Sequence, residues 1–227
     1  MTRHLICDTE TTGLSPTEGH RVIELACLEM VNHITTGRTW HWYFNPQRDV
    51  PIEAQRVHGI TTEFLRDKPL FSDAAQDILE LLDGAHLVAH NAPFDVGFLN
   101  AEFARCDLDA NCAHVTDTLA LARRKHPGGR HTLDALCKLY KIDRSARVKH
   151  GALVDCELLA EVFVGLIGGR QAALELVEEV DSSVSSVGAL QRPAALPGRV
   201  TAEELEAHAA FVAALGDRAI WLRGVTA

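Results

Sequence analysis

The sequence predicts an α/β domain built on a mixed β-sheet that is covered by helices on both faces. Two observations lead to this prediction. Residues 1–45 contain three strand-like segments rich in β-branched and aromatic side chains. From residue 51 onwards, short apolar segments alternate with stretches of helical periodicity. Strands that precede alternating strands and helices are typical of such a domain.

The elements follow in chain order. Strands are predicted over residues 3–8, 21–32 and 37–45, a meander in which the short polar segment NHITT separates the last two. A helix is predicted over residues 71–84, with Ser72 as its cap and Gly84 as its stop. The remaining predicted strands are 85–91 and 114–118, and the remaining predicted helices are 92–106, 132–140 and 151–169.

The chain of 227 residues is long enough for one domain with an appendage. We expect the domain to cover residues 1–180 and a flexible linker, rich in Ser, Pro and Gly, to cover 181–200. The tail, 201–227, begins with the capping box Thr201-Ala-Glu-Glu204 and continues as a helix. The apolar face of that helix holds Leu205, Ala209, Val212 and Leu215.

Composition excludes several classes of protein. No segment approaches the roughly 20 apolar residues that a membrane span needs, and the N-terminus lacks a signal-peptide pattern, so a cytoplasmic protein without a membrane partner is expected. The six cysteines form no CxxC pair and are expected to be free thiols. With a formal net charge of −9, the chain lacks the basic surface of a protein that binds duplex DNA through many phosphates.

Two acids follow the first apolar segment, in ICDTETTG. Asp8 and Glu10 are two residues apart, so on a strand they share one face at its carboxyl end, where ligands of α/β sheets bind. Two adjacent carboxylates repel each other unless a cation lies between them. The pair alone is equally compatible with a solvated strand end.

Three later residues extend this pattern. Asp95, in HNAPFDVGFL, begins an otherwise apolar helix face, and Asp155, in HGALVDCELLA, lies one turn into another helix with His150 just before it. Each alone is compatible with a structural role, since Asp is favoured in the first turn of any helix. Four carboxylates without a zinc-type ligand set favour Mg²⁺ or Mn²⁺, and two such ions could clamp a phosphodiester. His150 is then the candidate general base.

The motifs DTETTG, RVIEL, HNAPFDVGFL and HGALVDCELLA resemble those of the DEDDh family of 3′-to-5′ exonucleases, which have the ribonuclease H-like fold. VHGITTEFLRDKP, HTLDALCKLYKID and LIGGRQ extend the similarity over about residues 3–172. The resemblance is closest to the proofreading subunits of bacterial DNA polymerase III. It implies a nuclease that removes single nucleotides from a DNA 3′ end as 5′-monophosphates.

The resemblance also assigns residues. It makes Asp8, Glu10, Asp95 and Asp155 the ligands of two Mg²⁺ or Mn²⁺ ions, with Asp95 and His150 catalytic and His150 the general base. Contacts with the terminal nucleotide are implied for Asp8, Glu10, Thr11, Gly13, Leu14, Glu53, Val57, His58, Asn91, Phe94 and Asp155. For Glu53 and His58 the alternative is an exposed helix and its end, and for Leu14 and Phe94 it is core packing.

The C-terminal part resembles segments that bind replication partners. Gln171, Leu174 and Leu176 match the short peptide that docks on a sliding clamp, although the same residues could simply continue the preceding helix. The tail resembles the segment that binds the catalytic, alpha-like polymerase subunit, with Leu205, Val212 and Trp221 as candidate contacts. Alternatively the tail packs on its own domain.

Two other functions are compatible with these motifs. RNA-processing exoribonucleases of the DEDDh family use the same acids, and nothing in Asp8, Glu10 or His150 distinguishes the two sugars. The chain could also act mainly as a tether between polymerase and clamp, although an unused cluster of four acids would be an electrostatic liability.

Overall fold

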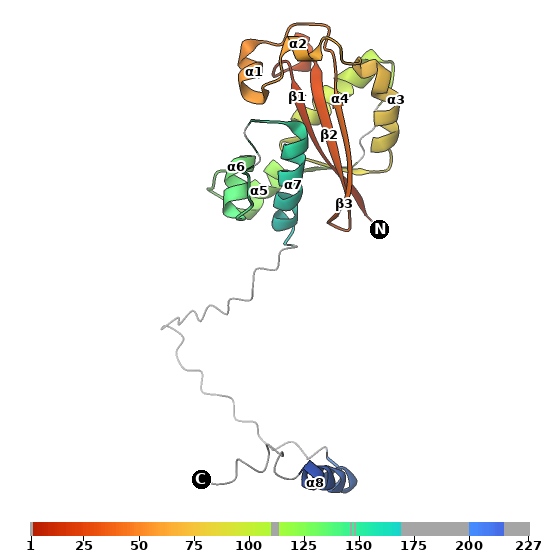
Figure 1. Ribbon diagram of the computed structural model, residues 1–227, viewed down its shortest axis with the longest axis vertical. Helices are drawn as coiled ribbons and strands as arrows, with labels where there is room; N and C mark the ends of the chain where they lie inside the picture. Colours follow the sequence, from red (N-terminus) through yellow and green to blue (C-terminus); the bar gives the residue numbers. More distant parts are fainter. Residues whose placement is uncertain (1, 110–113, 146, 148, 169–199, 216–227) are drawn as a thin grey trace. The chain divides into compact units, whose positions relative to one another are not determined.

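The computed structural model describes residues 2–109, 114–145, 147, 149–168 and 200–215. Its central feature is a five-stranded mixed sheet in the order β3-β2-β1-β4-β5 (Figure 1). β1 (Arg3–Thr11), β2 (Val22–Val31) and β3 (Ile34–Tyr43) are antiparallel neighbours, and β4 (His86–Ala89) and β5 (Val115–Asp117) run parallel to β1. This mixed sheet confirms the predicted fold class.

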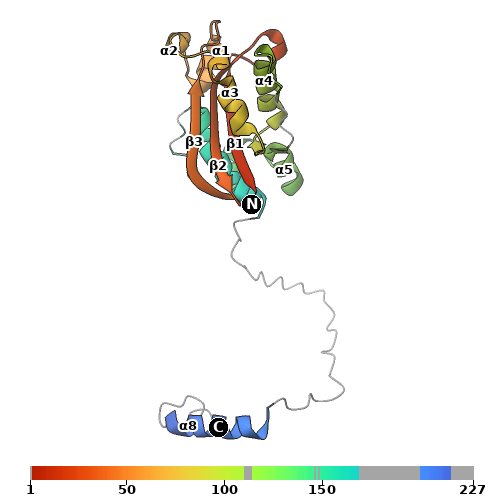
Figure 2. The same ribbon diagram turned by 90° about the vertical axis from the view of Figure 1, so that its right-hand side faces the viewer.

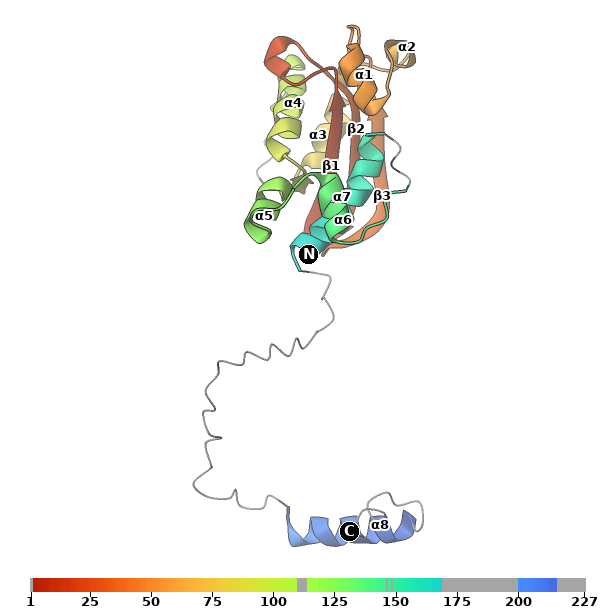
Figure 3. The same cartoon turned by 90° about the vertical axis from the view of Figure 1, so that its left-hand side faces the viewer.

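Helices cover both faces of the sheet. α3 (Phe71–Leu82) and α4 (Ala92–Arg105) pack on one face (Figure 2). α5 (Thr118–Lys125), α6 (Leu133–Leu139) and α7 (Ala152–Leu166) pack on the other (Figure 3). The short helices α1 (Ile52–His58) and α2 (Thr62–Leu65) lie at the end of the sheet where β1 terminates.

The alternation of side chains along β1 decides which helix each residue meets. Leu5 and Cys7 belong to the core beneath α3 and α4, whereas Ile6 belongs to the core beneath α7. Because successive strand residues point to opposite faces, Asp8 and Glu10 continue the series that starts with Ile6. The two acids therefore lie on the face that carries α7.

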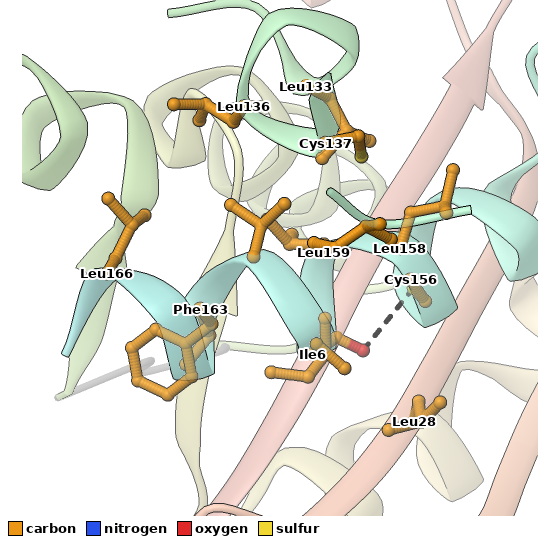
Figure 4. Packing of buried hydrophobic residues seen from close by; sticks show 14 of the residues in the cluster. Ile6, Leu28, Leu133, Leu136, Cys137, Cys156, Leu158, Leu159, Phe163 and Leu166 are labelled. Carbon is orange, nitrogen blue, oxygen red and sulfur yellow. Dashed lines mark hydrogen bonds between the residues drawn. The ribbon is translucent and has the colours of Figure 1, made fainter. Parts of the chain in front are cut away.

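Small residues let α7 approach the sheet closely. Ala152, Cys156 and Ala160 recur every fourth residue, so they share one helix face, and all three are buried. The thiol of Cys156 lies 3.5 Å from the carbonyl oxygen of Ile6 (Figure 4). It also lies 3.4 Å from the carbonyl oxygen of Ala26. This close approach places the neighbouring residue, Asp155, at the carboxyl end of β1.

Some predicted boundaries are wrong. The polar segment NHITT is not a loop of five residues, because β2 ends at Val31 and β3 begins at Ile34. Only Asn32 and His33 connect them, with φ of 51° and 66°. Two positive φ values are typical of the type I′ turn, whose twist matches that of the strands it joins.

The predicted cap of the helix over 71–84 is also wrong. α3 begins at Phe71, so its N-cap is Leu70 and Ser72 lies within the helix. The carboxylate of Asp73 completes the cap by accepting a 2.9 Å hydrogen bond from the backbone N–H of Leu70. The predicted stop agrees with the structure, since α3 ends at Leu82 and Gly84 follows with φ of 63°. The prediction omitted α5, whose segment of eight residues carries three consecutive cations at its end.

The tail is described by itself, as a second unit of the chain. α8 (Ala202–Leu215) confirms the predicted helix, and Thr201 and Glu204 make both bonds of the capping box, at 2.8 and 3.2 Å. Leu205 is exposed and Val212 is buried. The predicted linker, Gln171, Leu174, Leu176 and Trp221 lie outside the described residues, apart from Val200 at the linker's end.

The described cysteines, Cys7, Cys27, Cys106, Cys137 and Cys156, are free thiols, as expected. None of the described helices combines the length and the apolar character that a membrane span requires.

Candidate active site

β1 extends beyond its neighbour, and this creates the site. β4 pairs with β1 only at His4, Leu5 and Ile6, so the last residues of β1 have β2 on one side and an open edge on the other. Asp8 and Glu10 lie on this extension and are partly buried. The register of β1 against β2 shifts between Glu10 and Thr11, a bulge of the kind that redirects side chains next to active sites.

Asp95 lies at this open edge, where its carboxylate accepts a backbone hydrogen bond from β1 that a neighbouring strand would otherwise accept. It lies in the first turn of α4, is 2% exposed, and accepts hydrogen bonds from the backbone N–H of Thr9 at 3.0 Å and from its hydroxyl at 2.7 Å. Asp117, at the end of β5, fixes the start of α4 by accepting from the backbone N–H groups of Asn91 and Ala92 at 3.0 and 3.3 Å. Asp95 is therefore held next to Asp8 from the edge of the sheet.

Asp155 and His150 approach from the α7 side. Asp155 is buried, whereas the side chain of His150, just before the helix, is 50% exposed. Ligand atoms of Glu10, His150 and Asp155 all lie within 4.8 Å of one another. The structure thus brings together the five residues that the sequence singled out, from β1, α4 and the start of α7.

Burial and mutual repulsion perturb the pKa values of three acids. Burial, together with the charges of Asp95 and Glu10, raises the pKa of Asp8 well above its ordinary value. Burial and the neighbouring Glu24 raise the pKa of Glu10 to about 8. Burial also raises the pKa of Asp95 to about 7, although the two hydrogen bonds from Thr9 oppose this shift. Carboxylates in such a cluster need protons or a cation to coexist.

The donor set therefore fits a hard divalent cation. It offers carboxylate oxygens and one imidazole, and the carboxylates carry the negative charge that such an ion neutralises. Shifted pKa values of several acids in one place are also typical of functional sites.

Sequence reasoning missed three residues of this site. Thr9 lies between the two acids of the motif, and its hydrogen bond to Asp95 shows that it orients this carboxylate. Glu24 stands opposite Glu10 across the β1–β2 ladder and is held by His41, whose Nε2 lies 2.7 Å from a Glu24 carboxylate oxygen. Arg147 pairs with Asp155, and its Nη2 lies 2.6 Å from Oδ2 of that acid. An arginine in a polar loop carries no periodic signal that could have indicated this.

The implied nucleotide contacts differ in exposure. Leu14 is 85% exposed, which excludes core packing for it, and Glu53, Val57 and Asn91 are also exposed. Thr11 is buried and donates a 2.6 Å hydrogen bond to the carbonyl of Gly13, so these two residues shape the turn after β1.

Two of the implied contacts are apolar or neutral groups that the fold buries. Phe94 is partly buried against the core, with its ring centroid 4.9 Å from that of Phe98. His58 is 7% exposed, and burial lowers its pKa to about 4. Its Nδ1 accepts the backbone N–H of Ile60, so the neutral ring carries its proton on Nε2, which is buried near the backbone of Thr11 without a well-aligned hydrogen bond to any described residue.

Several known proteins are similar to this chain in sequence. The sequence model of the RNase_T family, described as exonuclease, matches residues 5–163. The DNA polymerase III epsilon subunit of Rickettsia conorii is 47% identical, over 92% of this chain and 95% of that protein. The epsilon subunit of Pasteurella multocida is 41% identical, over 96% and 90% of the two chains.

Solved structures share the fold. Exonuclease X, in complex with a 5′-overhanging duplex DNA, is 27% identical with a TM-score of 0.56, and the match covers 75% of this chain and 93% of that one. Exonuclease I is 21% identical with a TM-score of 0.65, over 75% of this chain and 42% of that one. At that identity, the likeness to exonuclease I shows the fold alone.

Proposed function

The chain belongs to the exonuclease family, in the branch of the DNA polymerase III epsilon subunits, and from this premise we propose that it is a metal-dependent 3′-to-5′ proofreading exonuclease. It hydrolyses the terminal nucleotide of a DNA 3′ end and releases a 5′-monophosphate. The convergence of Asp8, Glu10, Asp95 and Asp155 on one end of the sheet supports this proposal most directly.

We propose that the four acids hold two Mg²⁺ or Mn²⁺ ions. When bound, such ions neutralise the phosphodiester and make water a better nucleophile at neutral pH. Asp8 and Glu10 contribute from β1, Asp155 contributes from the opposite helix, and Thr9 orients the carboxylate of Asp95. The two hydrogen bonds from Thr9 keep Asp95 in place before the substrate arrives, which is the preorganisation that catalysis requires.

His150 is the proposed general base. Its exposure allows the ring to reach a water molecule next to the acids, and its place beside Gly151, before α7, gives it freedom to turn. A base of this kind contributes about 10² to 10⁴ in rate, so its loss costs less than the loss of a metal ligand.

The proposed substrate is a single-stranded 3′ end. We propose that the exposed side chains of Leu14 and Val57 contact the terminal base and that Phe94 stacks on it. The Nε2 of His58 is buried, so His58 is proposed to reach the nucleotide only when the groups that cover it move. We propose that Glu53 and Asn91, which are exposed, contact the polar edges of that nucleotide. An acidic chain needs no duplex grip of its own if the polymerase supplies it. A nanomolar affinity of the isolated chain for duplex DNA at physiological salt would argue against this division of labour.

The proposed partners are the catalytic subunit of the polymerase and the sliding clamp, in the cytoplasm. α8 supports the first, because Leu205 and Phe211 expose 59% and 60% of their surface on a helix that folds within the tail. Trp221 and the clamp peptide of Gln171, Leu174 and Leu176 complete this proposal from the sequence.

The experiment compares single strands that carry a label at the 3′ or the 5′ end, as DNA and as RNA, in Mg²⁺. Early release of 3′-label as a mononucleotide from DNA is the expected result. Early release of 5′-label would contradict the polarity, and faster cutting of RNA would favour an exoribonuclease. Activity that survives deletion of residues 181–227 would exclude a role as a tether alone.

A further inference from the structure

The guanidinium of Arg147 lies inside the acid cluster. The side chain is 8% exposed although it belongs to a loop. Its Nε donates to Oδ1 of Asp155, and its Nη2 donates to Oδ2 of the same carboxylate at 2.6 Å. This is the bidentate fork that makes Arg–carboxylate pairs strong.

The other contacts of Arg147 anchor it. Its Nη1 donates to Oδ1 of Asp134 at 2.8 Å, from the start of α6. Asp134 is 47% exposed and also pairs with Arg144 at 2.9 Å. Arg147 thus connects a solvent-facing acid with a buried one.

The fork takes up both oxygens of a metal ligand. Asp155 shares with Glu10 and His150 the space in which ligand atoms lie within 4.8 Å of one another. A divalent cation held there would meet a fixed positive charge at a few ångströms, in surroundings that screen charge poorly. The guanidinium and the cation are therefore rivals for Asp155.

The same guanidinium also covers the base. Nη2 of Arg147 lies 2.9 Å from Nδ1 of His150. The same Nη2 also lies 3.5 Å from Nε2 of the ring, so it sits over the face of the imidazole and not on the in-plane lone pair of Nδ1. The guanidinium thereby restricts the approach of water to this side of His150.

We propose that Arg147 is a latch of the active site, which a divalent cation opens by competing for Asp155. In the closed arrangement Arg147 is the counter-ion of the cluster and withholds both Asp155 and His150. When a cation binds, the guanidinium leaves both groups and keeps Asp134 as its partner. Arg147 is a positioning residue on this account, which rests on the proposed function.

The first test measures Mn²⁺ binding to the full chain by calorimetry, without substrate. Arg147→Met keeps the bulk of the side chain and removes its charge, and we expect it to bind Mn²⁺ at least about tenfold more tightly, the usual effect of one nearby charge. Arg144→Met is the matched control, because Arg144 pairs with Asp134 alone among the contacts described, and it should stay within about twofold of wild type.

Arg147→Lys separates charge from geometry. It keeps the positive charge but lacks the fork, so its Mn²⁺ affinity should lie between those of wild type and Arg147→Met. Melting in chelator gives a second readout: Arg147→Met should melt at a lower temperature than wild type because Asp155 loses its counter-ion.

Mn²⁺ binding distinguishes failure of the latch from failure of the metal site. Weaker or unchanged Mn²⁺ binding in folded Arg147→Met would overturn the latch, because a residue that merely supports the loop predicts that result. No Mn²⁺ binding in wild type would overturn the metal site as well, and with it the proposed function.

A measurement on wild type does not depend on how the variants fold. The Nε–H resonance of Arg147, assigned by comparison with Arg147→Lys, should exchange slowly with solvent in chelator because Nε donates to Asp155. Saturation with Mg²⁺ should speed this exchange as Arg147 leaves. An Nε–H that exchanges rapidly in chelator, or that does not respond to Mg²⁺, would contradict the proposal.

Discussion

The acid cluster should make the metal-free protein less stable as the pH rises from about 7 to about 8.5. Burial raises the pKa of Glu10 to about 8 and of Asp95 to about 7, and that of Asp8 well above its ordinary value. A carboxyl group whose pKa is higher in the folded than in the unfolded state holds its proton only when folded. The stability that this contributes is complete below the unfolded pKa, and it is lost as the pH passes the folded pKa.

The size of the effect follows from the pKa of each group. One proton held only by the folded state changes the free energy of unfolding by about 1.4 kcal/mol per pH unit. Over the stated interval, Glu10 and Asp95 give a loss of about 1–3 kcal/mol, or about 3–10 °C in melting temperature for a chain of this size. Histidines with a lowered pKa make the protein more stable as the pH rises, but only at pH values below this interval. They are His4, His58, His86 and His90.

Calorimetric melting in chelator and in saturating Mg²⁺, at several pH values, measures this effect. We expect the melting temperature to fall with pH in chelator and not in Mg²⁺, since a bound cation replaces the protons. Glu10→Gln, which removes one titrating group, should flatten the slope. A melting temperature in chelator that is constant or rises over this interval would refute the reasoning.

Three further predictions concern support of the site. Glu102 is 1% exposed and accepts hydrogen bonds of 2.7 and 2.8 Å from Arg21. Glu102→Ala should therefore lower the free energy of unfolding in urea by about 3–5 kcal/mol. A decrease below about 1 kcal/mol would show that the pair does not fix α4 to β2. Leu159→Ala should cost about 2–5 kcal/mol by the same assay, because Leu159 is buried in the core formed by α7, α6 and the sheet, and a neutral change would mean that the core collapses around it. Thr9→Val removes the 2.7 Å bond to Asp95 and should slow nucleotide release about tenfold, and an unchanged rate would mean that the backbone bond suffices.

Much of the fold could be predicted from the sequence because its signals are local. The short apolar run within residues 3–8 indicates a strand that is buried on both faces, and the long apolar segment within 151–169 indicates a buried helix; both elements are confirmed. Boundaries were less accurate where a single hydrogen bond decides them. Asp73 competes with Ser72 for the start of α3, and only the geometry of the backbone settles that Asp73 completes the cap.

The acids of the site could be predicted from the sequence, but the residues that hold those acids in place could not. Asp8, Glu10, Asp95 and Asp155 stand out because charges interrupt apolar segments, which is visible without coordinates. The contact between Thr9 and Asp95 spans 86 residues of sequence, and it depends on the early end of β4. Arg147 depends in the same way on how the loop before α7 folds back over Asp155.

The most direct test of the central claim is the rate of nucleotide release from a 3′-labelled single-stranded DNA by wild type and Asp8→Ala, each with Mg²⁺ and with chelator. Wild type should cut rapidly only in Mg²⁺, and Asp8→Ala should be slower by a factor of about 10² to 10³ or more, the usual cost of removing one group that stabilises the transition state. Equal rates for the two proteins, or cutting by wild type that chelator does not reduce, would contradict the assignment of the acid cluster as a metal-dependent active site.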